Sequence, residues 1–169
     1  MKQLFLFTFV LLFIQPGFSQ NKSENKNSTY YLIRHAEKDR SDSSNHNPHL
    51  LEKGKKRAEQ WSNVLKNINF DAVYSTNYHR TIETATPTAI KNNIEISYYD
   101  PKSIDTQEFL QITNGQSVLV VGHSNSTPKF VNNILSQDKY KHIDDSNNSN
   151  LYIVTISEDS VSDILLFVE

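Results

Sequence analysis

The chain has 169 residues, with 17 basic and 19 acidic side chains and a formal net charge of −2. This near-balance gives no general basic character, so a nucleic-acid partner is not expected. The length favours one folded domain, and the absence of cysteine excludes disulfides and thiol redox chemistry.

The first residues have the pattern of an export signal. A basic start at Lys2 precedes an apolar run at 4–14, and the small residues Gly17 and Ser19 suit cleavage by a signal peptidase. We therefore expect residues 1–19 to be a signal peptide, so that the mature protein is periplasmic or extracellular. A retained membrane anchor is the less favoured alternative, because the run is short for a bilayer span. No cysteine follows it, which excludes a lipoprotein anchor.

Residues 20–28 are polar and rich in Asn, Lys and Ser, and we expect a disordered linker there. The remaining residues, 29–169, are enough to bury one core without disulfides. We expect no stable membrane anchor after signal cleavage, and the sequence makes no prediction of the oligomeric state.

Along 29–169, β-rich runs alternate with helical patterns. Strands are expected at 29–33, 72–75, 94–99, 117–121, 151–156 and 161–168, and helices at 52–67, 80–92, 105–113 and 127–135. Polar loops are expected at 39–48 and 138–150, and residues 157–160 suit a hairpin. The alternation predicts an α/β fold, a three-layer α/β/α sandwich whose mostly parallel sheet is made mixed by the last hairpin.

Three of these strands lead into residues suited to an anionic ligand. The first leads into Arg34-His35, the second leads past Thr76 to Arg80, and the fourth leads into His123. In α/β folds ligands bind at the carboxyl ends of the strands. Two guanidinium groups and two imidazoles at this edge suit a phosphate that is attacked by a histidine.

In their order and spacing these segments resemble the histidine phosphatase superfamily, which has the phosphoglycerate mutase-like fold. The segments are Arg34-His35, the stretch from Ser75 through Arg80 to Thr84-Ala85, and Val121-Gly122-His123-Ser124. The usual Arg-His-Gly of the superfamily reads Arg-His-Ala here, which is similar to the short, SixA-like phosphatases. The resemblance runs from Tyr30 to Ile156 and implies this fold and a phosphatase activity. No cofactor is expected.

We expect His35 to be the nucleophile, because a neutral imidazole can attack phosphorus with one nitrogen while the other holds its proton on an acceptor. Arg34 and Arg80 suit a phosphate clamp, since a guanidinium stays charged and matches two phosphate oxygens. The resemblance implies that His123 binds phosphate in its protonated form, and a bound dianion would raise its pKa.

The neighbours of His123 have less specific roles. Gly122 is expected to allow a tight turn of the backbone. Ser124 and Asn125 either donate to the phosphate or cap the following helix. The segment is not a nucleophile elbow of the Gly-x-Ser-x-Gly type, because no second glycine follows.

The sequence defines the proton donor to the leaving group less well. Asp100 follows a strand and precedes Pro101, which suits a residue that reaches over the pocket, whereas Glu37 lies two residues after the nucleophile. We favour Asp100 over Glu37, and Glu83 is a third candidate that is placed to pair with Arg80. The acid-bearing insertion of the mutases is missing, which argues against a mutase. A weak acid would favour phosphoramidates over esters.

The remaining histidines lack the spacing of a metal-binding motif, and we interpret them as surface residues: His46, His49, His79 and His142. No metal site is therefore expected. Together, the features predict an exported, metal-independent phosphatase that acts on phosphomonoesters or phosphoramidates of small molecules or phosphopeptides. A catalytically weak phosphate-binding module of the same fold is the main alternative, and a metal-dependent hydrolase is a further one.

Overall fold

The computed structural model describes residues 27–169. The expected signal peptide, 1–19, and the expected linker up to residue 26 lie outside the described residues. The first strand, β1 (Ser28–Arg34), begins one residue earlier than expected. Ser28 is buried there, and its hydroxyl accepts a hydrogen bond of 2.8 Å from the Gly115 N–H. The folded unit therefore includes Ser28, although the polar composition of residues 20–28 predicts that this serine belongs to the linker.

The described chain alternates between strands and helices in the predicted order. The later strands are β2 (Ala72–Ser75), β3 (Ile96–Tyr98), β4 (Ser117–Gly122), β5 (Asn150–Ile156) and β6 (Val161–Phe167). The helices are α1 (Glu52–Val64), α2 (His79–Asn92), α3 (Thr106–Ile112) and α4 (Ser126–Leu135). The clearest shifts are the earlier end of α1 and the later start of β3. The second arises because Asn93 is left-handed and the Ile94 N–H still bonds back to Ala89.

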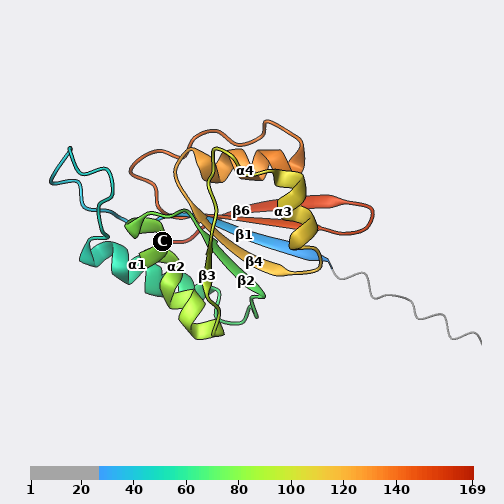
Figure 1. Ribbon diagram of the computed structural model, residues 1–169, viewed down its shortest axis with the longest axis horizontal. Helices are drawn as coiled ribbons and strands as arrows, with labels where there is room; N and C mark the ends of the chain where they lie inside the picture. The colour runs from blue at the N-terminus through green and yellow to red at the C-terminus, as the bar shows by residue number, and fades with distance from the viewer. Residues whose placement is uncertain (1–26) are drawn as a thin grey trace, which may run out of the picture.

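The six strands form one mixed sheet in the order β3-β2-β4-β1-β5-β6 (Figure 1). The pairs β2–β3, β2–β4 and β1–β4 are parallel, whereas β5 is antiparallel to both β1 and β6. The predicted fold class, an α/β fold with a mostly parallel mixed sheet, is confirmed. Strand β1 lies where the sheet changes from parallel to antiparallel pairing.

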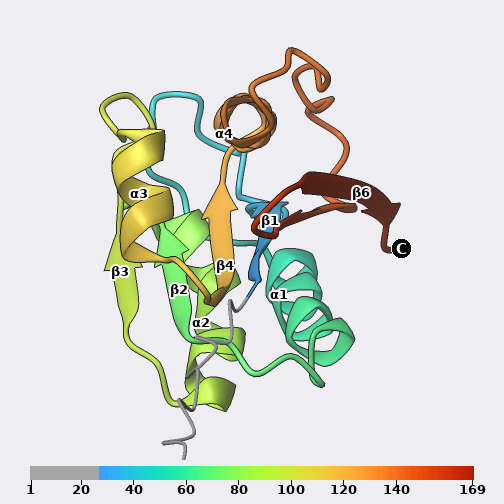
Figure 2. The same cartoon turned by 90° about the vertical axis from the view of Figure 1, so that its right-hand side faces the viewer.

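Helices cover both faces of the sheet (Figure 2). On one face, Phe109 of α3 and Phe130 of α4 pack against β1 and β4 in one core cluster. On the other face, Trp61 of α1 and Ala85 of α2 pack against the opposite sides of the same strands. Strand β4 is therefore apolar from Val118 to Val121, as expected for a strand buried on both faces.

The strand register brings the proposed catalytic segments together. Arg34, the last residue of β1, pairs with Gly122, the last residue of β4, and the His35 N–H donates to the Gly122 carbonyl over 2.9 Å. On the other side of β4, the Thr76 N–H donates to the Val121 carbonyl. Three strands consequently end at one edge of the sheet, within one or two residues of each other.

Gly122 has a different role from the expected tight turn. Its φ is not positive, and among residues 27–169 Gly115 is the glycine with a positive φ, 72°. A Cβ at residue 122 would instead lie 2.7 Å from Thr127 Oγ1 and 2.8 Å from the Tyr99 hydroxyl oxygen. The residue is glycine because the first turn of α4 and Tyr99 pack directly against it.

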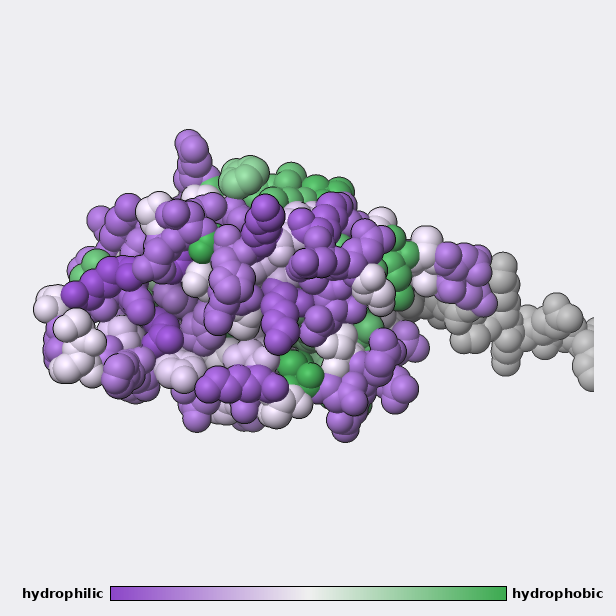
Figure 3. Space-filling view, turned by 90° about the horizontal axis from the view of Figure 1, so that it is seen from above, coloured by the Kyte–Doolittle hydropathy of each residue, from purple (hydrophilic) through white to green (hydrophobic). Residues whose placement is uncertain are grey.

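The surface is mostly hydrophilic, with hydrophobic residues gathered at one margin of the view in Figure 3. The edge strand β6 carries several exposed apolar side chains, among them Ile164, Leu166 and Phe167. Within residues 27–169, none of the helices has the length and apolar character needed to cross a bilayer.

Candidate active site

The proposed nucleophile, His35, is almost fully buried at 3% exposure and lines a cavity at the end of β1. Its Nδ1 lies 2.7 Å from the carbonyl oxygen of Ala36. A carbonyl only accepts, so Nδ1 carries the proton and Nε2 holds the free lone pair. Burial, followed by the charges of Arg34, His123 and Arg80, lowers the pKa of His35 to about 3. The imidazole is therefore neutral at physiological pH, as a nucleophile must be.

The segment around His35 is fixed from both sides. The carbonyl of His35 accepts a hydrogen bond of 2.8 Å from the Asn148 amide, and the N–H of Ala36 donates to the Thr84 hydroxyl over 2.9 Å. Thr84 in turn donates to the Arg80 carbonyl within α2. The nucleophile is thus held by α2 and by the loop before β5, and its orientation does not depend on its own strand alone.

The second histidine, His123, faces His35 with ring centroids 5.6 Å apart. Its Nε2 lies 2.9 Å from the Thr76 hydroxyl, and its Nδ1 lies 3.5 Å from Arg80 Nη2. Arginine only donates, so Nδ1 is the acceptor and the ring proton is on Nε2. Burial and then the charges of Arg80, Lys38 and Arg34 lower the pKa of His123 to about 4. In the ligand-free structure this histidine is consequently neutral.

Arg34 is 2% exposed and is held by the loop that precedes β5. Its Nη1 donates to the carbonyls of Asp144 and Asn147, and its Nη2 lies 2.5 Å from Asp145 Oδ1. The Nε, also buried, has no hydrogen-bond partner. The guanidinium is thus fixed rigidly, but its Nη2 is already bonded to the Asp145 carboxylate. Hydrogen bonds from Arg40 and Arg34 lower the pKa of Asp145 to about 2, so it stays ionised.

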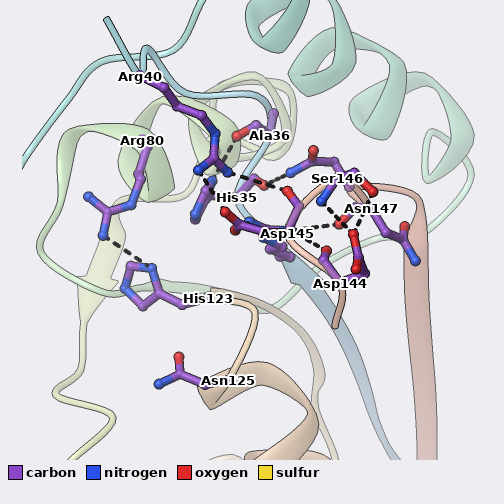
Figure 4. A network of polar contacts seen from close by, with 12 residues as sticks. His35, Ala36, Arg40, Arg80, His123, Asn125, Asp144, Asp145, Ser146 and Asn147 are labelled. Atoms are coloured by element: carbon purple, nitrogen blue, oxygen red, sulfur yellow. Dashed lines mark hydrogen bonds and ion pairs between the residues drawn. The ribbon is translucent and has the colours of Figure 1, made fainter. Parts of the chain in front are cut away.

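Arg80 lies in the first turn of α2, 9% exposed, and its side chain reaches toward His123 (Figure 4). Its guanidinium carbon lies 4.5 Å from the centroid of the Tyr78 ring, which supports it by a cation–π contact. Its Nη1 donates to the His46 carbonyl over 3.3 Å, and its buried Nε has no partner. Arg34 and Arg80 therefore each carry a buried Nε–H donor that has no partner within the protein. Such donors are costly unless a ligand accepts from them.

These four side chains line one open cavity of about 1080 Å³. Its charged lining consists of five cations and two carboxylates: Arg34, Lys38, Arg80, Lys102 and Lys129, with Asp100 and Asp145. The protein as a whole carries a charge of −2, so this local excess of positive charge is a property of the site. A low-dielectric cavity of one sign attracts and holds the opposite charge. The cavity is therefore suited to a phosphate-sized anion.

The structure separates the three candidate acids. Glu37 does not line this cavity, because its carboxylate pairs with Arg57 Nε at 2.9 Å. Glu83 is not paired with Arg80 as expected; it contacts His49 and accepts from the Leu50 N–H. Asp100 lines the cavity, but its carboxylate accepts from the Lys102 N–H and the Ser103 hydroxyl in a surface turn. Of the three, only Asp100 lines the cavity that holds both histidines.

The residues after His123 are mainly structural. The Asn125 side chain caps α4 by accepting from the Ser126 N–H, and it lies apart from the Arg80–His123 pair in Figure 4. Ser124 lines the cavity, and its carbonyl accepts from the Ile143 N–H. The Ser126 hydroxyl accepts from the His123 N–H. Asn125 therefore caps the helix, and it also lines the cavity.

Several residues of the site carry no signal in the sequence: Lys38, Tyr78, Lys102, Lys129, Asp145 and Asn148. Thr76 and Thr84 differ from these, because they belong to the segment from Ser75 to Ala85 that the sequence singles out. Asp145 stands beside His142 in an acidic segment that reads as a surface loop, and only the fold brings it to Arg34. The site thus depends on loops whose partners are more than a hundred residues away.

A sequence profile of the histidine phosphatase superfamily (branch 1) matches residues 30–101. The match includes the Arg34-His35 pair and Arg80, which the structure brings together at one cavity. Over this stretch the chain is similar to the histidine phosphatase superfamily. The expected enzyme class, a histidine phosphatase, is confirmed by this match. The profile ends before His123, so it covers less than the expected resemblance to Ile156.

Solved structures extend the similarity over most of the chain. A proposed phosphohistidine phosphatase, SixA from Agrobacterium tumefaciens, has a TM-score of 0.62 at 22% identity, with 82% of this chain and 97% of that chain covered. The protein histidine phosphatase SixA complexed with tungstate has a TM-score of 0.66 at 17% identity, with 82% and 96% covered. Phosphoglycerate mutase from Bacillus anthracis has 0.63 at 18% identity, with 84% and 93% covered. These proteins share the fold. No curated protein sequence matches the chain.

Proposed function

We propose that the protein is an exported phosphatase that hydrolyses phosphomonoesters or phosphoramidates through a phosphohistidine and needs no metal ion for the chemical step. The observation that carries the proposal is the contact between His35 and Ala36. It leaves Nε2 of a neutral imidazole unprotonated in a cavity that two arginines line. A nucleophile with a fixed tautomer beside two cations is what attack on a phosphate requires.

In the first step, the Nε2 lone pair of His35 attacks phosphorus, and the bond from phosphorus to the leaving oxygen or nitrogen breaks. The guanidinium groups of Arg34 and Arg80, which line the cavity, donate to the phosphoryl oxygens. The incoming dianion raises the pKa of His123, which then becomes a third cationic donor. In the second step, water attacks the phosphohistidine, phosphate leaves, and His35 returns to its neutral form.

The cationic side chains position the phosphoryl group and neutralise its charge, which other phosphatases achieve with metal ions. Phosphoryl transfer needs mainly positioning and neutralisation of the oxygens. Here Arg34 and Arg80 are buried, and burial lowers the pKa of both guanidinium groups without removing their charge at neutral pH. Their charge is therefore used in a medium of low dielectric, where it is more effective than in water.

The leaving group decides the substrate class. Asp145 is held ionised by Arg40 and Arg34, so it has no proton to give. Asp100 is the remaining candidate acid near the cavity, and it is exposed. A general acid contributes about 10²–10⁴-fold, and the reaction of an ester depends on it more than that of a phosphoramidate. We therefore favour phosphoramidates, in particular phosphohistidine, over alkyl phosphates. The structural similarity to the two SixA proteins, which are described as phosphohistidine and protein histidine phosphatases, supports the same choice.

The cavity also favours a substrate that is not fully enclosed. It is wide and open, and Lys102 and Lys129 line it in addition to the arginines. Small phosphorylated molecules and phosphorylated peptides both fit such an opening. Tungstate, which is bound in one structural neighbour, is an oxyanion of the same geometry as phosphate and is expected to inhibit.

Export is supported by the sequence pattern at 1–19, which lies outside the described residues. A protein without cysteine is equally compatible with the cytoplasm and with an oxidising compartment, so the absence of cysteine is not evidence for export. Fractionation of cells that express the full chain, with mass spectrometry of the N-terminus, tests it. A mature protein that begins at Gln20 outside the cytoplasm is expected, and an intact Met1 in the cytoplasm would contradict export.

Hydrolysis of p-nitrophenyl phosphate and of a phosphoramidate in the presence of EDTA tests the activity. Turnover should persist, and rapid acid-free quenching should trap base-stable, acid-labile phosphate on the protein. His35→Ala should abolish turnover but still bind phosphate. Retained turnover in that variant would exclude the phosphohistidine route, and loss of wild-type turnover in EDTA would indicate a metal-dependent hydrolase. Binding without turnover in the wild type would favour the phosphate-binding module, which the contact of Arg34 with Asp145 also permits.

A further inference from the structure

Three side chains that commonly bind metal ions meet at the start of α2, outside the cavity. The ligand atoms of His49, His79 and Glu83 all lie within 4.8 Å of one another. The rings of His49 and His79 stack with centroids 4.0 Å apart, and Nδ1 of His49 contacts the Glu83 carboxylate. We propose that this cluster binds one divalent transition-metal ion of the zinc type and thereby links the loop at 38–50 to α2.

The backbone explains why these residues meet. His79 and Glu83 are four residues apart on α2, so their side chains lie on one face of the helix. His49 comes from the base of the loop, which an isolated bridge between Lys38 and Leu50 closes. The His49 carbonyl also accepts from the Asp39 N–H over 2.9 Å. Two separate segments therefore contribute ligands from fixed positions.

A second set of hydrogen bonds orients the ligands. Glu83 Oε2 accepts from the Leu50 N–H over 2.8 Å, which directs Oε1 toward His49. The N–H of His79 donates to the Asn47 side chain over 2.8 Å, which fixes the loop against the first residue of the helix. Bonds of this kind to the groups around a metal position its ligands and strengthen binding. One ligand, Glu83, therefore has such a supporting bond, whereas the bond of His79 comes from its backbone and holds the loop.

The donor set indicates the class of ion. Two imidazole nitrogens and one carboxylate oxygen suit Zn²⁺, Ni²⁺ or Cu²⁺, whereas Mg²⁺ and Ca²⁺ prefer oxygen ligands. With bonds of about 2.0–2.1 Å, a tetrahedral ion needs ligand atoms about 3.3 Å apart. Because the two imidazole rings are stacked at an interplanar angle of 14°, they must turn as well as approach each other to direct one nitrogen each at a common ion. Both histidine side chains are exposed, which leaves room for this rotation. Water would occupy the fourth position.

The expected effect of the ion is structural. None of its three ligands lines the cavity, so the ion is not in contact with the reacting phosphate. The loop that it would fix contributes the His46 carbonyl to Arg80. No local motif in the sequence predicts this site, because the spacing from His79 to Glu83 supplies only two ligands and the third comes from the loop. The expectation of surface histidines without a common role is therefore replaced by this proposal.

Titration of the chelator-treated, full-length protein with Zn²⁺, followed by calorimetry, tests the site. One ion per chain is expected, and Mg²⁺ should give no binding. His49→Ala, His79→Ala and Glu83→Gln should each weaken Zn²⁺ binding by at least about tenfold. Glutamine keeps an acceptor for the Leu50 N–H, so Glu83→Gln removes the ligand charge without releasing the loop.

Two variants serve as matched controls. His46→Ala removes an imidazole from the same loop and should bind Zn²⁺ as tightly as the wild type. His35→Ala removes an active-site imidazole and should also bind normally. Unchanged affinity in all three ligand variants, or loss of binding in His35→Ala, would overturn the proposal, and the second result would assign the ion to the cavity. The absence of stoichiometric binding by the wild type would overturn it as well. Circular dichroism of each variant checks that it is folded.

Discussion

The imidazole rings of His35 and His123 meet nearly edge to face, at an interplanar angle of 68° and a centroid distance of 5.6 Å. Both rings are neutral in the ligand-free site, for the same reason: burial and the neighbouring cations disfavour a further positive charge. A bound dianion offsets the positive charge of the neighbouring arginines and thereby raises the pKa of His123. Capture of phosphate is therefore coupled to the uptake of a proton.

This pair predicts how stability depends on pH. The pKa values of both histidines are lowered on folding from 6.5 to about 3 and about 4, so below pH 6.5 the unfolded chain binds protons that the folded chain does not. Stability should be at its full value above that pH and should fall as the pH drops toward 4. The expected loss by pH 5 is at most about 2 kcal/mol for each histidine. Urea unfolding at pH 7 and pH 5 measures it.

The double variant His35→Asn, His123→Asn is the matched comparison, because it removes both titrating groups and keeps polar side chains. Its stability should change less between pH 7 and pH 5 than that of the wild type. An equal change in both proteins would show that other groups cause the acid sensitivity.

Arg80→Lys should reduce kcat/KM by about 10²–10³-fold. Lysine keeps the positive charge, but it lacks the planar group that stacks on Tyr78 and the buried Nε–H that has no partner in the protein. Initial rates with p-nitrophenyl phosphate and the inhibition constant of tungstate report the loss. Arg57→Lys, which changes an arginine paired with Glu37 outside the cavity, is the control and should retain activity. A fall of less than tenfold in Arg80→Lys would contradict a clamp role.

Asp145→Asn should strengthen the binding of phosphate by several-fold at pH 7. The carboxylate is 66% exposed and contacts Arg34 Nη2, so it competes with an incoming anion for this donor. Product inhibition constants for the wild type and the variant measure the effect. Asp144→Asn is the control, because that carboxylate bonds to Ser146 and only its backbone carbonyl contacts Arg34. Weaker phosphate binding in Asp145→Asn would mean that the carboxylate positions Arg34 and does not compete.

Asp100→Asn should slow the hydrolysis of an alkyl phosphate by about tenfold or more and leave a phosphoramidate almost unaffected, because only the ester depends strongly on an acid. The ratio of kcat/KM for the two substrates is the measurement. The same small effect on both substrates would remove Asp100 from the reaction and leave its role in the turn with Lys102 and Ser103.

Gly122→Ala should lower the free energy of unfolding by about 1–3 kcal/mol, as expected for an added methyl group in a packed region. The new Cβ would approach Thr127 Oγ1 and the Tyr99 hydroxyl, both closer than normal contact. Activity should fall as well, because His123 is the next residue. Adding Tyr99→Phe removes one of the two close oxygens and should restore part of the stability. No recovery in the double variant would place the strain at Thr127.

The sequence predicts the elements of this fold well, because hydrophobic periodicity and turn residues define each of them locally. It also predicts that Arg34, His35, Arg80 and His123 meet, since carboxyl ends of parallel strands share one edge of a sheet. It does not predict what the two long polar loops contact. The loop at 138–150 supplies Asp145, and the loop at 38–50 supplies His49. Such contacts join residues that are far apart in sequence and have no periodic pattern.

The acceptors of Arg34 also determine how much of the chain must be in place before the protein is active. The carbonyls of Asp144 and Asn147 lie more than a hundred residues after the arginine that they fix. A chain that ends after α4 already contains both histidines and both arginines of the site, yet Arg34 has nothing to hold it. Activity of the exported protein should therefore appear only after translocation has delivered the C-terminal segment and β5 has joined β1.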